Sequence, residues 1–129
     1  MSKGTVFYLD DEEELLEFVK FVLERYGYRV IVGERWEDGY YDILENVDMI
    51  ILDIMFPADE INGYEICKRI KSRENLKNIP VYMFSAKAFD EDKEEAISSG
   101  AEGFIEKPTP IDELVNLVNR VVSERRANG

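Results

Sequence analysis

The chain alternates between short apolar segments and longer segments with the period of a helix. The short segments are rich in β-branched or aromatic residues and lie at 5–9, 29–32, 49–52, 81–84 and 103–105. Unbroken apolar runs of this length are typical of strands that are covered on both faces. Between them, apolar residues recur at spacings of three and four, most clearly from Ile111 to Val122. Five such pairs predict an α/β fold with a parallel sheet and right-handed crossovers.

We expect one domain over residues 1–129, with residues 123–129 as a short charged tail. A chain of this length buries roughly two-thirds of its unfolded surface, and the apolar fraction of 45% is ordinary. The least regular part is 34–47, where Trp36, Tyr40 and Leu44 keep helical spacing but Gly39 interrupts it. We predict a short second helix there.

Charge and composition argue against several classes of protein. A net charge of −12 argues against direct contact with nucleic acid, which takes clustered Lys and Arg. The chain has no histidine and a single cysteine, Cys67, which excludes histidine catalysis, an internal disulfide and a Cys-rich zinc site. No signal peptide is visible, and no run approaches the roughly 20 apolar residues of a membrane span. We therefore expect a soluble, cytoplasmic protein without a membrane partner.

Polar residues follow four of the five predicted strands. Asp10 and Asp11 come after the first, Asp53 directly after the third, Ser85 after the fourth, and Lys107 just past the fifth. The carboxyl ends of parallel strands share one edge of the sheet, where ligands bind. We expect these residues to converge in space, although they are far apart in the sequence.

Their chemistry fits phosphoryl transfer. Three carboxylates that meet at one point need positive charge to stay ionised, and a hard divalent cation such as Mg²⁺ suits all-oxygen ligands. A carboxylate held in this way can attack a phosphoryl group. The Lys107 ammonium and the Ser85 hydroxyl would stabilise the negative charge on that group. The product would be an acyl phosphate on Asp53.

Each of these residues taken alone has a simpler structural explanation. Asp10 or Asp11 could cap the first helix, and Asp53 could cap the loop that follows it. Ser85 could belong to an ordinary turn, and Lys107 to a charged one. It is the joint pattern, with each residue at the end of its own strand, that favours a functional site.

The motifs also resemble a known family over essentially the whole chain. They are Phe7-Tyr8-Leu9-Asp10-Asp11, Ile50 to Pro57, Gly63-Tyr64-Glu65, Phe84-Ser85-Ala86, and Gly100 to Pro108. As a set they resemble the receiver domain of two-component response regulators, in particular the single-domain chemotaxis regulators. The resemblance implies a flavodoxin-like (βα)5 three-layer sandwich, whose five-stranded parallel sheet has the family's order 2-1-3-4-5.

The resemblance further implies a phosphoryl acceptor and its metal. Asp53 would accept the phosphoryl group from a phosphohistidine on a sensor histidine kinase or a His-containing phosphotransfer protein. Asp11 and Asp53 would bind Mg²⁺, for which Mn²⁺ can substitute, with Asp10 helping directly or through water. The Met55 backbone carbonyl would be another ligand. The protein would catalyse only its own phosphorylation and dephosphorylation, and in that sense is not an enzyme.

Other roles implied by the family concern the phosphoryl group and the output. Ser85, Ala86 and Lys107 would contact the phosphoryl group. Ser85 and Phe104 would form a switch pair, and the bond before Pro108 would be cis. The chain would signal through protein contacts to an effector, either as a monomer or as a phosphorylation-dependent dimer. That dimer would form through the face of the fourth helix, fifth strand and fifth helix.

One segment departs from the family pattern. The loop between Pro57 and Gly63, which includes residues 58–62, is longer than the common family spacing. It adds Asp59 and Glu60 near the expected phosphorylation face. This departure bears on the shape of the loop and on contacts with a kinase, and leaves the acceptor unchanged.

Three other functions are weaker. A Mg²⁺-dependent phosphatase would need a general acid two residues after the nucleophile, where this chain has Met55. A receiver-like interaction module that is never phosphorylated would typically lack one of the acids or the lysine. A nucleotide-binding flavodoxin relative would need a Gly-rich or Ser/Thr-rich loop after the first strand, where this chain has acids.

Overall fold

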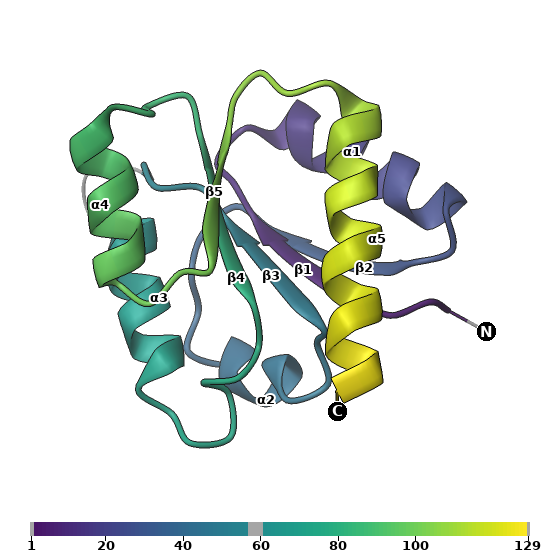
Figure 1. Ribbon diagram of the computed structural model, residues 1–129, viewed down its shortest axis with the longest axis horizontal. Helices are drawn as coiled ribbons and strands as arrows, with labels where there is room; N and C mark the ends of the chain where they lie inside the picture. Colours follow the sequence, from purple (N-terminus) through teal and green to yellow (C-terminus); the bar gives the residue numbers. More distant parts are fainter. Residues whose placement is uncertain (1, 57–60, 129) are drawn as a thin grey trace.

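Five parallel strands alternate with five helices in the computed structural model, which describes residues 2–56 and 61–128. In chain order the elements are β1 (Thr5–Leu9), α1 (Glu13–Arg25), β2 (Arg29–Gly33), α2 (Tyr40–Leu44), β3 (Met49–Leu52), α3 (Gly63–Lys71), β4 (Val81–Ser85), α4 (Asp90–Ser98), β5 (Gly103–Glu106) and α5 (Ile111–Asn128). The strand order is β2-β1-β3-β4-β5 (Figure 1). The predicted flavodoxin-like fold and its order are confirmed.

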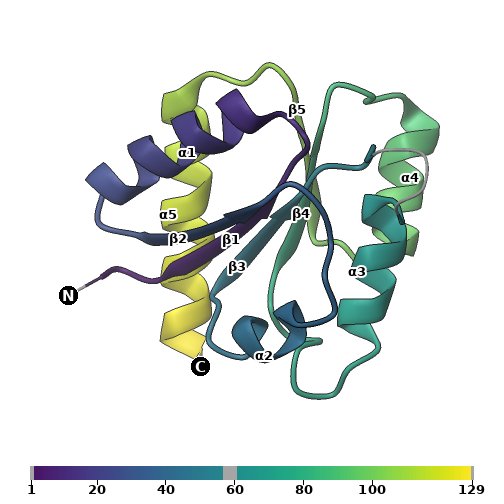
Figure 2. The same cartoon turned by 180° about the vertical axis from the view of Figure 1, so that it is seen from behind.

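The sheet is covered on both faces, as the unbroken apolar strands predict. Helices α1 and α5 pack on one face, and α2, α3 and α4 on the other (Figures 1 and 2). Strand residues alternate between the two cores: Val6 and Tyr8 belong to the α1–α5 side, and Phe7 and Leu9 to the other. The face on which a strand residue lies therefore determines which polar groups at the carboxyl edge it can contact.

The helices begin and end where the sequence allows. Leu16, Val19 and Leu23 form the buried stripe of α1. Gly27 follows α1 and Gly100 follows α4, with φ angles of 97° and 100°. This left-handed conformation suits glycine and turns the chain back into the next strand. The predicted second helix is present but short.

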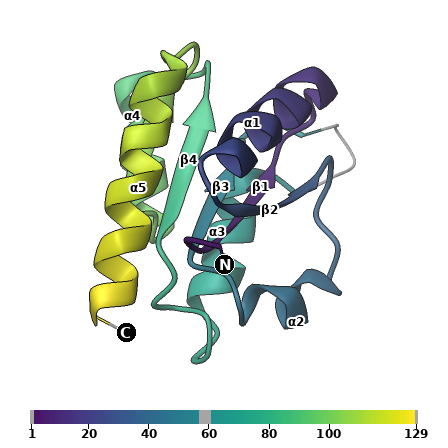
Figure 3. The ribbon, with the colours of Figure 1, turned by 90° about the vertical axis from the view of Figure 1, so that its right-hand side faces the viewer.

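Helix α5 runs back along the sheet, and its last turns lie beside the start of β1 (Figure 3). Arg126 near its end lies 3.2 Å from Asp48 Oδ2, just before β3. The strand ends that carry the acids are therefore at the opposite edge from this contact. Among the helices of residues 2–56 and 61–128, none is long and apolar enough to cross a membrane.

Candidate functional site

Backbone hydrogen bonds continue for one residue beyond the ends of β3 and β5, and they fix the positions of Asp53 and Lys107. The Asp53 amide donates to the Leu9 carbonyl at 2.9 Å, and the Lys107 amide donates to the Ser85 carbonyl at 3.0 Å. Asp53 and Lys107 therefore leave the sheet at fixed positions. Their side chains start from rigid strands rather than from free loops.

The three predicted acids come together at this edge. Asp10, Asp11 and Asp53 each offer a carboxylate oxygen, and these oxygens lie within 4.8 Å of one another. Asp10 is fully buried and Asp53 is 5% exposed, whereas Asp11 faces solvent. An all-oxygen set with one open side fits a small hard cation such as Mg²⁺, which keeps several water ligands.

Lys107 is the positive charge of the cluster. Its Nζ lies 2.6 Å from Asp10 Oδ2, 2.7 Å from Glu12 Oε2 and 3.5 Å from Asp53 Oδ2. Burial alone would lower the pKa of Lys107, but the hydrogen bonds to Asp10 and Glu12 outweigh it and raise the pKa above its usual value. The side chain therefore stays charged beside the acids.

The buried position of the Asp53 carboxyl group, close to Asp10, shifts its pKa. Burial, and next the charge of Asp10, raise its pKa to about 7, against an ordinary value of 3.8. Lys107 and the Ile54 amide, which donates to Asp53 Oδ1 at 2.7 Å, act in the opposite direction. In the absence of a cation, the acid is therefore poised between its two protonation states near neutral pH.

A shallow pocket of about 220 Å³ opens over these groups. Its lining is Asp11, Glu12, Asp53, Met55, Ser85, Ala86, Lys87 and Lys107. The buried Ser85 Oγ accepts a hydrogen bond from the Lys87 amide at 3.1 Å. The pocket therefore offers a carboxylate, a hydroxyl and an ammonium group to one small anion.

The two other predicted features lie next to this pocket. Phe104 is half-buried on β5, packs against the α3–α4 side of the core, and is in register with Met83 on β4. The Lys107–Pro108 peptide bond is cis. Of the long loop, Ile61 and Asn62 belong to the described residues, whereas residues 58–60, including Asp59 and Glu60, lie outside them.

Two residues of the site were not identified from the sequence. The Tyr8 hydroxyl donates to Asp10 Oδ2 at 2.6 Å, and Glu12 binds Lys107. Tyr8 precedes Asp10 by two residues and so lies on the same face of the strand, a signal that could have revealed it. No local sequence pattern marks Glu12, because its partner Lys107 comes from the far end of the chain.

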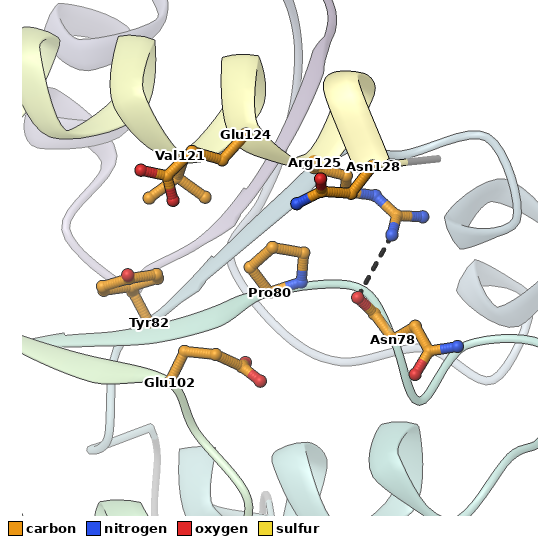
Figure 4. Close-up of a pocket in the computed structure, with 8 residues that line it drawn as sticks. All are labelled: Asn78, Pro80, Tyr82, Glu102, Val121, Glu124, Arg125 and Asn128. Atoms are coloured by element: carbon orange, nitrogen blue, oxygen red, sulfur yellow. Dashed lines mark hydrogen bonds between the residues drawn. The ribbon is translucent and has the colours of Figure 1, made fainter.

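A second pocket, of about 450 Å³, opens at the opposite edge of the sheet (Figure 4). It lies between the last turns of α5 and the starts of β4 and β5. There Arg125 Nη1 donates to the Asn78 carbonyl, and Glu102 and Glu124 also line the space. The predicted acids, hydroxyl and lysine all lie at the other edge, so we place the candidate functional site there.

The molecule is thus a flavodoxin-like α/β protein in which three acids and a lysine lie together at the carboxyl edge of the parallel sheet. The family model of the response regulator receiver domain matches residues 6–119. The chain therefore belongs to the receiver-domain family of response regulators.

Known relatives agree with this assignment. The chain is 38% identical over 119 residues to the response regulator GtcR of Aneurinibacillus migulanus, covering 91% of this chain and 47% of that protein. It is similar to the high-resolution structure of the chemotaxis response regulator CheY4 of Vibrio cholerae, with 25% identity, a TM-score of 0.80 and coverage of 92% of this chain and 98% of that chain. A CheY-like receiver domain protein from Methanospirillum hungatei shares the fold, at 21% identity, a TM-score of 0.85 and 98% coverage of both chains. The chain spans about half the length of the curated relatives it matches.

Proposed function

We propose that this chain is a phosphorylation-controlled signalling switch whose acceptor is Asp53. The observation that carries the proposal is the convergence of Asp10, Asp11, Asp53 and Lys107, from three strand ends, around one small pocket. The phosphoryl donor is a phosphohistidine on a sensor histidine kinase or phosphotransfer protein. A cytoplasmic location follows from such a donor.

In the transfer step a carboxylate oxygen of Asp53 attacks phosphorus. The phosphorus–nitrogen bond of the donor breaks, its electron pair stays on the histidine nitrogen, and a phosphorus–oxygen bond to Asp53 forms. Lys107 and the Ser85 hydroxyl then lie beside the outer oxygens of the phosphoryl group, together with the Ala86 backbone. The chemistry is the protein's own modification and its slow reversal, not turnover of a separate substrate.

Asp11 and Asp53 would hold Mg²⁺, with the Met55 carbonyl as a further ligand and Asp10 acting directly or through water. When bound, the cation neutralises charge on the carboxylates and on the incoming phosphoryl group. Mn²⁺, with similar oxygen preference, would substitute. Met55 lines the pocket beside Asp53, which is consistent with this role for its backbone.

The output is a change in the half of the sheet that holds β4 and β5. Ser85 is buried at the end of β4, and Phe104 lies on the neighbouring strand β5. A phosphoryl group on Asp53 draws the Ser85 hydroxyl toward it, and the Phe104 ring occupies the space that is vacated. The face formed by α4, β5 and α5 then presents a changed surface to an effector or to a second copy of the chain.

The test is phosphorylation by a small phosphodonor in the presence of Mg²⁺, followed by intact-protein mass spectrometry. We expect a mass gain of one phosphoryl group that Asp53→Asn abolishes and Asp90→Asn, a change at an exposed acid on α4, retains. An unmodified wild type, with Mg²⁺ and donor in excess, would overturn the proposal. That result would favour the alternative of a receiver-like module that binds partners without being phosphorylated.

A further inference from the structure

Tyr8 occupies an unusual place for a polar side chain. It lies in the middle of the buried strand β1 with no exposed surface, and its ring packs against Phe84 at a centroid distance of 5.9 Å. The side chain has little room to move, because α1 and α5 cover this face of the sheet. Its hydroxyl group is thus held at a fixed point, directly beneath the acids.

That hydroxyl donates to Asp10 Oδ2 at 2.6 Å. The same oxygen receives Lys107 Nζ, also at 2.6 Å, and Asp10 Oδ1 receives the Glu12 amide at 2.9 Å. A carboxylate has about four lone-pair sites. Among the described residues, these three donors take both sites on Oδ2 and one on Oδ1. The Asp53 carboxyl group also hydrogen-bonds to Asp10 when it is protonated. With Asp53 ionised, Asp10 has a single remaining site, on Oδ1, for a cation or for water bound to it.

We propose that the Tyr8 hydroxyl is a positioning group that restricts how Asp10 binds a cation and thereby favours Mg²⁺ over Ca²⁺. The inference rests on the proposed metal role of the acids. Mg²⁺ needs few protein oxygens because it keeps its waters, whereas Ca²⁺ takes six to eight oxygens and readily accepts both oxygens of one carboxylate. When Oδ2 is occupied by hydrogen bonds, Asp10 can bind Mg²⁺ through one oxygen but cannot bind Ca²⁺ through both.

Tyr8, rather than Lys107, provides the permanent block. Lys107 Nζ lies only 3.5 Å from Asp53 Oδ2, so a phosphoryl group on Asp53 competes for it. The lysine is also 11% exposed at its side chain and shared with Glu12. Tyr8 has no second acceptor in reach among the hydrogen bonds of the described residues. Its hydrogen bond therefore persists when Lys107 turns away.

A buried tyrosine needs a hydrogen-bond partner in any case, so a purely structural role must be separated from this one. Tyr28 supplies the matched control. It is a buried tyrosine on the same face of the sheet, and its hydroxyl donates to Asn119 Oδ1, away from the acids. Tyr8→Phe and Tyr28→Phe each remove one buried hydroxyl and keep the ring.

The experiment is calorimetric titration of the wild type and both variants with Mg²⁺ alone and with Ca²⁺ alone. We expect Tyr8→Phe to lower the ratio of the Ca²⁺ to the Mg²⁺ dissociation constant by about fivefold, the effect of one hydrogen bond on an equilibrium constant. Tyr28→Phe should leave that ratio at the wild-type value, even if the protein becomes less stable. An unchanged ratio in Tyr8→Phe would overturn the inference.

A measurement on the wild type covers the case in which Tyr8→Phe does not fold. The Tyr8 hydroxyl proton, buried and hydrogen-bonded, should give a slowly exchanging NMR signal with contacts to the Phe84 ring. We expect this signal to persist at saturating Mg²⁺, and its loss would overturn the inference. A wild type that binds neither ion and takes up no phosphoryl group would instead count against the proposed function itself.

Discussion

Lys107 Nζ and Asp10 Oδ2 lie 2.6 Å apart, and this buried ion pair joins the end of β5 to the end of β1. The two strands are not neighbours, since β3 and β4 lie between them in the sheet. The contact therefore spans the carboxyl edge from β1 to β5, across the end of β3 where Asp53 lies. It places a positive charge 3.5 Å from Asp53 Oδ2, beside a carboxyl group that the neighbouring acids repel.

Replacing Lys107 should expose the repulsion between the buried acids as a loss of stability. We expect Lys107→Ala to destabilise the metal-free protein by about 3 kcal/mol, because the change leaves buried carboxylates without their positive partner. Urea unfolding at pH 8 measures the effect. Lys93→Ala removes an exposed, solvent-screened pair with Glu106 and should leave the stability close to the wild-type value. Equal losses in the two variants would contradict the assignment of Lys107 as the central charge.

The raised pKa of Asp53 predicts a pH dependence of stability in the absence of divalent cations. Asp53 binds its proton more tightly in the folded state, with a pKa of about 7 against 3.8, so its protonated form favours folding. This contribution is complete below about pH 4 and is lost as the pH rises through about 7. We expect the free energy of unfolding in a chelator to fall between pH 5.5 and 8. The decrease should be smaller in Asp53→Asn, and an identical slope would count against the shift.

Added Mg²⁺ should reverse this trend. A cation that binds only the folded acids stabilises the protein by RT ln(1 + c/Kd), where c is the free Mg²⁺ concentration, and it competes with the proton on Asp53. We expect the rise in melting temperature with Mg²⁺ to be larger at pH 8 than at pH 5.5. Differential scanning calorimetry at both pH values checks this, with Asp53→Asn expected to reduce the response.

The start of α4 depends on a buried acid. Asp92 Oδ2 accepts the Phe89 amide at 3.1 Å, and Asp92 Oδ1 receives the Tyr64 hydroxyl of α3 at 3.3 Å. We expect Asp92→Ala to cost about 1 kcal/mol, because it removes the acceptor of the Phe89 amide at the start of α4, whereas the Tyr64 hydroxyl keeps the Asp92 backbone carbonyl at 3.2 Å. Asp90→Ala, two residues earlier and exposed, should cost well under half of that in the same urea titration.

Gly63 lets α3 begin directly against the acceptor. A Cβ atom at this position would lie 2.2 Å from the Asp53 carbonyl oxygen and 3.0 Å from Ile54 Cα. We expect Gly63→Ala to destabilise the protein by about 1–3 kcal/mol, since the backbone next to Asp53 has to shift. It should also slow phosphorylation by the small donor. Gly39→Ala is the control, because a Cβ there meets nothing within 4 Å.

Much of this site can be predicted from the sequence, because most of its residues lie directly after strands. Asp10, Asp53, Ser85 and Lys107 could be placed at one edge because parallel strands put their carboxyl ends together. Glu12 could not be paired with Lys107 in the same way. That contact depends on where the chain after β5 passes the start of α1, which no local pattern encodes.

The Tyr8 hydrogen bond was missed for a different reason. The apolar run of β1 predicts a buried side chain at every position, and the Tyr8 ring is consistent with this prediction. The strand period places Tyr8 on the same face as Asp10, but only the structure shows that the ring packs against Phe84 and that its hydroxyl donates to the carboxylate. The short α2 was predicted because Gly39 breaks the helical spacing, and the structure has just five helical residues there.

The register of the sheet has one more consequence. Leu52, the residue before the acceptor, is level with Met83 on β4, and Met83 is level with Phe104 on β5. Residues that are level in parallel strands point to the same face, and neighbouring strands are about 4.8 Å apart. The neighbour of the acceptor and the aromatic ring at the rim are therefore about 10 Å apart, with Met83, a long and unbranched side chain, standing between them. Because methionine is unbranched and flexible, Met83 can repack when either of its neighbours in this row moves.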